Sequence, residues 1–137
     1  MPGRKRDERG ASALELSIIA PMLLGLIFMS VQAALWLYGR SVALNAAQEG
    51  VSQLRLIQPP VYNDGLGEQV RAETQAYAAR LGGTALRNTR VPDLTYDDVA
   101  GQVSVTVAGD TVSLIPGVTL TVTRTATGPI EQFEADN

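Results

Sequence analysis

The apolar and polar positions of the chain change pattern along its length, beginning with an uncharged run at residues 16–39. Within this run, the residues from Leu16 to Tyr38 are all apolar except Ser17, Pro21, Gly25, Ser30 and Gln32. As a helix, the run is about 35 Å long at ~1.5 Å per residue, which covers a hydrocarbon core of ~30 Å. Because only a helix satisfies its own backbone in lipid, the run predicts a transmembrane helix, which we place at residues 11–39.

Charged residues around this run predict its orientation. A basic leader at residues 1–10 contains Arg4, Lys5, Arg6 and Arg9, whereas the first basic residues after the run are Arg40 and Arg55. The excess of positive charge before the run places the N-terminus in the cytoplasm and the C-terminal part outside. We therefore expect a single-pass protein of the cell membrane, with its C-terminal domain extracytoplasmic.

Two other interpretations of the apolar run remain open. A buried helix of a soluble protein would need more chain around it than this sequence provides. A cleavable secretory signal is the stronger rival, because Val31-Gln32-Ala33 resembles a small-x-small cleavage site. However, apolar residues continue through Leu37, which is unusual for the start of a secreted protein.

Residues 40–58 keep a helical period but are less apolar. Small or apolar residues form one stripe along this segment, namely Ala43, Ala46, Ala47, Gly50, Val51 and Leu54. We expect the membrane helix to continue through this extracytoplasmic segment, giving one helix of roughly 40 residues that ends before Pro59-Pro60.

Residues 59–137 predict a small extracytoplasmic domain. Asn63 or Asp64 can cap a helix at residues 66–81, which Gly82-Gly83 would end. The predicted buried side of that helix consists of Leu66, Val70, Tyr77 and Leu81.

Beyond residue 90 the period becomes that of strands. Strict alternation at residues 102–107 and 118–123, with a shorter apolar segment at 112–115, predicts three antiparallel strands. A turn is expected at residues 108–111, and residues 90–96 would add a fourth strand if they pair at the edge. One face of the sheet is apolar and needs the two helices as its cover. The predicted fold class is α+β: a long N-terminal transmembrane helix, one further helix and a small antiparallel sheet of 3–4 strands.

Composition excludes several classes of chemistry. The chain has no Cys and no His, which rules out disulfides, thiolate or imidazole catalysis and Cys/His zinc sites. The acidic group Asp93, Asp97 and Asp98 lacks the ligand spacing and bend glycine of a calcium loop, so a solvated loop is expected. We therefore expect no enzyme activity, cofactor or metal. The acidic balance after residue 16 also argues against nucleic acid as a partner.

The residues just before the apolar run carry the most specific motif. The chain reads Arg9-Gly10-Ala11-Ser12-Ala13-Leu14-Glu15-Leu16, with a glycine at the water boundary and a glutamate five residues later. A carboxylate at the edge of the lipid is costly when it has no partner, so a partner for Glu15 is expected. The open alternative is that Glu15 is only a carboxylate in the first turn of the helix, where the positive end of the helix dipole stabilises it and Ser12 completes a capping box.

These residues, together with Pro21 and the leucines after it, resemble the TadE-like family of tight-adherence pilus assembly proteins, which are pseudopilin-like. A weaker similarity covers residues 112–133. The resemblance implies that a prepilin peptidase cuts between Gly10 and Ala11 and that Glu15 acts in assembly with other pilin-like subunits. It also implies inner-membrane pilus platform proteins as partners. Where the family has an aromatic residue after the glutamate, this chain has Leu16, a departure that bears on the processing.

Ser17, Pro21 and Gly25 fall on one side of the predicted membrane helix. Small residues on one side let a second helix approach closely, and Pro21 would bend the helix by freeing the carbonyl of Ser17. The alternative is a tolerated kink that faces lipid.

The sequence therefore favours a non-enzymatic, membrane-anchored, pseudopilin-like component of tight-adherence pilus assembly or a related secretion machinery. The alternative is a membrane-tethered extracytoplasmic binding module that is unrelated to pili and not processed at Gly10.

Overall fold

The computed structural model describes residues 5–131, with side chains from residue 10 onward. The basic side chains of the leader and the residues after Glu131 lie outside the described residues. Contacts divide the chain into two compact units, Met1–Ala34 and Leu35–Asn137. The first helix runs through both units, and every other element belongs to the second.

Helix α1 (Lys5–Arg55) has 51 residues and is longer than predicted because it begins inside the leader. It continues through Pro21 without interruption and ends four residues before Pro59. Ser12 therefore lies inside the helix and cannot cap its first turn, so the capping box considered for Ser12 and Glu15 is wrong.

Helix α2 (Asp64–Gly82) is capped at both ends by residues that the sequence indicated. The Asn63 side chain accepts a hydrogen bond from the Leu66 N–H at 3.0 Å, and the Gly83 N–H donates to the Ala79 carbonyl. Its buried residues are Gly67, Val70, Thr74, Ala78 and Gly82, so the prediction is confirmed for Val70, whereas Leu66 and Tyr77 are half-buried. Leu81, predicted to be buried, is 39% exposed.

The sheet has three antiparallel strands in the order β1-β2-β3. They are β1 (Leu86–Asp97), β2 (Gln102–Thr111) and β3 (Leu120–Pro129). The edge strand expected at residues 90–96 is confirmed as part of β1, which has two irregularities in its pairing with β2. Asn88 lies at the first of them with a φ of 49°.

The strand predicted at residues 112–115 is wrong. Residues 112–119 form a loop, and β2 continues through the segment 108–111 that was predicted as a turn. Cross-strand bonds explain the difference, because the Asp110 carboxylate accepts hydrogen bonds from the Thr121 hydroxyl at 2.9 Å and the Asn88 amide at 3.0 Å. These bonds hold Gly109-Asp110 in the ladder despite its preference for turns.

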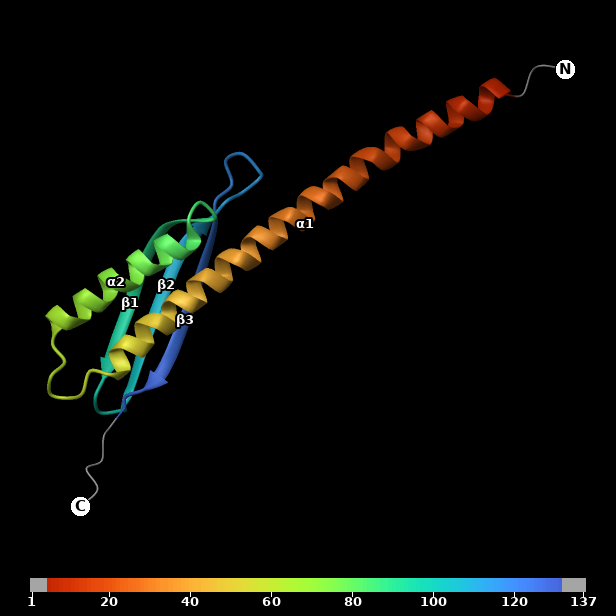
Figure 1. Cartoon of the computed structure of the whole chain (residues 1–137). Helices are drawn as coiled ribbons and strands as arrows, with labels where there is room; N and C mark the ends of the chain where they lie inside the picture. Colours follow the sequence, from red (N-terminus) through yellow and green to blue (C-terminus); the bar gives the residue numbers. More distant parts are fainter. Residues whose placement is uncertain (1–4, 132–137) are drawn as a thin grey trace. The chain divides into compact units, whose positions relative to one another are not determined.

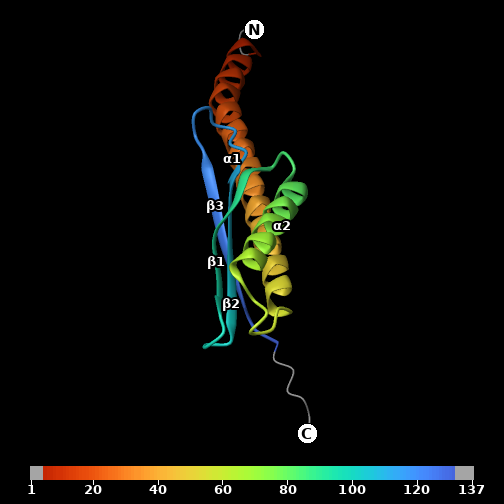
Figure 2. The same ribbon diagram turned by 90° about the vertical axis from the view of Figure 1, so that its left-hand side faces the viewer.

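Both helices cover the same face of the sheet, as Figure 2 shows for α2 and the C-terminal part of α1. The core combines the small-residue stripe of α1 with valines of β2, since Val103, Val105 and Val107 are at most 1% exposed. All six residues predicted for the α1 stripe are buried. The other face of the sheet carries hydroxyl groups, with the Thr106 and Thr125 oxygens 2.8 Å apart. The predicted α+β architecture is thus confirmed (Figure 1).

Candidate functional site

The N-terminal part of α1 holds the residues predicted to act in processing and assembly. Gly10, Ala11 and Glu15 are exposed and helical. A Cβ added at Gly10 would meet no described atom within 4 Å, so none of the residues that the structure describes covers the predicted cleavage position. Because a peptidase binds an extended backbone, cleavage between Gly10 and Ala11 would require this turn of the helix to unwind.

The apolar residues of this segment have no partner surface within the first unit. Met22 is 72% exposed, Leu14 68% and Leu26 64%. Exposed apolar side chains on this scale mark a surface that lipid or other apolar helices cover. Among the described residues, α1 is the one helix that is long and apolar enough to cross a membrane, which fits a single-pass membrane protein.

The side of α1 predicted for helix packing is open along its length. Gly25 has no atom within 4 Å of an added Cβ, so a neighbouring helix could approach its backbone closely. The Ser17 hydroxyl donates to the Ala13 carbonyl at 2.8 Å, and Ser30 makes the equivalent bond to Leu26. These hydroxyl protons are therefore satisfied within the helix.

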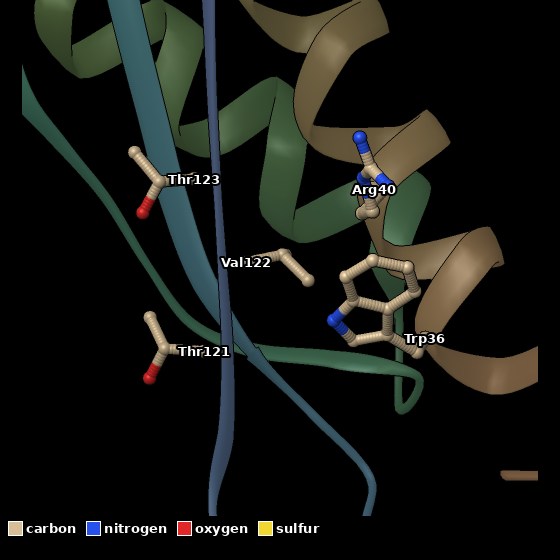
Figure 3. Close-up of a pocket in the computed structure, with 5 residues that line it drawn as sticks. All are labelled: Trp36, Arg40, Thr121, Val122 and Thr123. Atoms are coloured by element: carbon tan, nitrogen blue, oxygen red, sulfur yellow. The ribbon is translucent and has the colours of Figure 1, made fainter. Parts of the chain in front are cut away.

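Where α1 enters the second unit, its aromatic residues pack on the folded domain. Arg40 lies over the Trp36 ring, with its guanidinium carbon 4.5 Å from the ring centroid. Together with Thr121, Val122 and Thr123 they line a hollow of about 300 Å³. Figure 3 shows the Val122 side chain pointing toward α1 and the two threonine side chains pointing away from it. The Tyr38 hydroxyl donates to the Leu81 carbonyl at 3.4 Å.

These contacts give Trp36 and Tyr38 a role in the folded domain that the hydropathy pattern does not predict. Trp36 and Tyr38 lie at the end of the apolar run and are aromatic residues of the types that favour the membrane–water interface. In the structure Trp36 also packs against the hydrophobic core, and Tyr38 reaches the end of α2. The junction between the apolar run and the domain is therefore tied to both the sheet and the second helix.

The far end of α1 is also held, by polar contacts that the sequence did not indicate. The Arg55 side chain donates to the Pro129 carbonyl at 2.9 Å and pairs with Glu131 at 3.2 Å. Nearby, the rings of Tyr62 and Tyr96 are stacked with centroids 4.0 Å apart. Burial is the main effect that raises the pKa of both phenols. A neighbouring carboxylate raises each pKa further, that of Asp64 for Tyr62 and that of Asp98 for Tyr96. Contacts of this kind join residues that are far apart in the chain, so they leave no periodic pattern in the sequence.

Within the acidic group Asp93, Asp97 and Asp98, the Asp97 side chain makes a structural contact. Asp97 accepts a hydrogen bond from the Ala100 N–H at 2.8 Å and so closes the turn between β1 and β2. Asp93 and Asp98 are exposed. Across the part of the chain that the structure describes, no group of three or more Asp, Glu, His or Cys residues could hold a metal ion.

Comparison with known protein families gives one match within the chain. Residues 10–52 match the family model described as TadE-like protein. No curated protein and no solved structure matches the chain. The match begins at Gly10 and ends within the buried stripe of α1, so it spans the apolar run and its extension into the domain. The chain thus has a TadE-like N-terminal segment, as the motif around Gly10 and Glu15 predicts.

Proposed function

We propose that this protein is a non-enzymatic, single-pass membrane component of tight-adherence pilus assembly or a related secretion machinery, with a pseudopilin-like role. The TadE-like match over residues 10–52 carries the proposal. The match covers the long helix, the part of the chain whose exposed apolar side chains need partners. The folded domain would lie outside the cell and the basic leader inside.

In this proposal α1 has two tasks. Its exposed N-terminal part lies in the bilayer and meets other pilin-like subunits and the inner-membrane platform through the side that contains Ser17, Pro21 and Gly25. Its C-terminal part is buried in the domain through small residues such as Ala46 and Gly50.

Glu15 is the residue that we propose to act in assembly. It is exposed on α1, next to Leu14 at 68% and Leu16 at 66% exposure. A carboxylate in this apolar setting gains most from a cationic partner. After cleavage by a prepilin peptidase, the new amino group at Ala11 of a neighbouring subunit is a partner of the required charge.

The N-terminus of the mature protein tests the processing step. Purified protein from cells that contain the pilus machinery should begin at Ala11. A start at Ala34 would indicate a cleaved secretory signal instead. An intact N-terminus would support the alternative of a membrane-tethered binding module without prepilin-type processing.

The role of Glu15 is tested by Glu15→Ala and Glu15→Gln in cells. Both variants should remain in the membrane but lose pilus formation and the recovery of pilin-like partners. Glu73→Ala is a matched control, because Glu73 is exposed on α2, outside the TadE-like segment. Normal pili in both Glu15 variants would contradict the assembly role.

A further inference from the structure

The loop between β2 and β3 combines exposed apolar side chains with an absence of charge. No residue from Thr111 to Thr123 is charged. Ile115 is 58% exposed and Val118 42% exposed, and Leu114 beside them is 39% exposed. Loops that face water normally carry polar residues, so this apolar tip needs an explanation from its surroundings.

The loop is a defined turn. The Val118 N–H donates to the Ile115 carbonyl at 3.2 Å, with Pro116 between them and Gly117 at a φ of 79°. These features match a type II turn, which needs a glycine at its third position. The Ser113 hydroxyl donates to the Ile115 carbonyl at 3.2 Å and accepts from the Ile115 N–H at 3.1 Å. Backbone groups satisfied inside the turn lower the cost of moving it out of water.

Contacts within the folded unit place this loop at the end where the apolar run enters. A Cβ added at Gly39 would overlap the Thr111 side chain, and a Cβ at Gly50 would lie 3.2 Å from a Val105 methyl carbon. As α1 proceeds from Gly39 to Gly50, β2 therefore runs in the opposite direction. The loop after Thr111 thus lies at the same end of the unit as Leu35, the first residue of that unit. Figure 1 shows the loop in blue beyond the ends of β2 and β3.

The opposite end of the sheet has a different character. Asp97 ends β1 and Asp98 follows it in the turn to β2, and the ion pair joins Arg55, the last residue of α1, to Glu131, two residues after β3. Val99 is the exposed apolar residue of that turn, at 95% exposure. The two ends of the domain are thus unlike in charge: the end that adjoins the apolar run carries an uncharged tip, and the far end carries the acidic turn.

We propose that the turn at residues 114–118 is a second membrane contact, which inserts Ile115 and its apolar neighbours into the interface of the outer leaflet. Its partner is the lipid surface into which the apolar run of the same chain leads. Trp36 and Arg40, at the same end of the domain, have the side-chain types that favour the lipid interface. Two attachment points, the helix and the turn, would fix how the domain stands on the bilayer. The proposal rests on membrane anchoring by α1 but not on a role in pilus assembly.

Fluorescent labels on single cysteines test this contact, since the natural chain has none. Full-length Ile115→Cys carries an environment-sensitive dye in vesicles of phosphatidylcholine and phosphatidylglycerol. Val99→Cys is the water-exposed control, and Leu24→Cys is the control within the apolar run. We expect blue-shifted emission at residue 115 and stronger quenching by lipids with a shallow nitroxide than with a deep one. The label would then lie about 5–10 Å into the interface.

The controls separate this inference from the anchoring. Quenching at residue 24 together with a water-like label at residue 115 would overturn the second contact and leave the anchor standing. A blue-shifted label at residue 115 that lipid nitroxides do not quench would indicate a protein cover and also overturn it. A label at residue 24 that lipids fail to quench would overturn both. As a second variant, Ile115→Asp should restore water-like emission to a label at Val118→Cys, whereas Val99→Asp should not.

Discussion

Gly50 is a position at which α1 lies close to both α2 and the sheet, so it offers a sharp test of the packing. A Cβ at residue 50 would lie 2.6 Å from the Thr74 hydroxyl oxygen and 3.2 Å from a Val105 methyl carbon. Thr74 is 0% exposed, so its side chain cannot turn aside into solvent. The substitution Gly50→Ala therefore forces α1 away from its neighbours.

Two opposing effects set the magnitude. Overpacking of a well-packed core costs about 1–3 kcal/mol. Replacing glycine by alanine inside a helix stabilises the folded state by ~1 kcal/mol. The balance is a net loss of about 1 kcal/mol in the free energy of unfolding. When Thr74→Ala is also present, the hydroxyl contact is gone, and Gly50→Ala should be neutral or stabilising by up to ~1 kcal/mol.

The assay is denaturant unfolding of the full-length protein in detergent micelles. Trp36 is the single tryptophan and packs on the core, so its fluorescence reports the domain. Gln48→Ala, on the exposed side of α1, is the control and should change the unfolding free energy by less than ~0.5 kcal/mol. If Gly50→Ala stabilised the protein equally with and without Thr74, the close approach of α1 to α2 would be refuted.

Three further predictions concern polar groups of the domain. Hydrogen bonds, the strongest effect being that from Asn88, lower the pKa of Asp110 in the folded protein. The ionised Asp110 side chain therefore stabilises the fold above its unfolded pKa, and this stabilisation is lost as the pH falls through the lower folded pKa. Asp110→Asn should flatten the acid dependence of the melting temperature below about pH 5, and an unchanged slope would contradict this. The Tyr96 hydroxyl donates to the Ile57 carbonyl, and Tyr96→Phe should cost about 1 kcal/mol in denaturant unfolding; no loss would show that the bond contributes nothing. Thr74 Oγ1 is buried without a hydrogen-bond partner among the described residues, so Thr74→Val should stabilise by about 1 kcal/mol, and a lower unfolding midpoint would argue against it.

The sequence predicts best where one physical requirement dominates. The uncharged run of α1 could be predicted as a helix from its length and hydropathy alone. The small stripe from Ala43 to Leu54 was predicted correctly because a period of 3.6 residues and close packing select the same positions. The cap at Asn63 follows from its local hydrogen bond.

Prediction from the sequence fails where residues distant in the chain determine which side chains are buried or paired. In α2 the buried side follows small residues, because a Cβ at Gly82 would lie only 2.7 Å from the Leu86 Cβ. A larger residue cannot occupy that position, so Leu81 stays exposed although hydrophobicity alone would bury it. Likewise Asp110 stays in β2 because its partners lie on the two adjacent strands.

The candidate site shows the same division. The motif at Gly10 and Glu15 was readable from the sequence, and the family match over residues 10–52 agrees with it. The apolar turn at residues 114–118 was instead predicted in part as a strand, because the short apolar segment at 112–115 resembles one. Only the course of α1 beside β2 reveals that this turn lies at the same end of the domain as Leu35.

The most direct test of the account is the side of the membrane on which the domain lies. Val99→Cys in the full-length chain should react with a membrane-impermeant maleimide in intact spheroplasts, since Val99 is 95% exposed. The labelled protein should remain in the membrane pellet after alkaline carbonate washing. Labelling only after the inner membrane is broken, or release of the protein by carbonate, would contradict an apolar helix that holds this domain outside the cell.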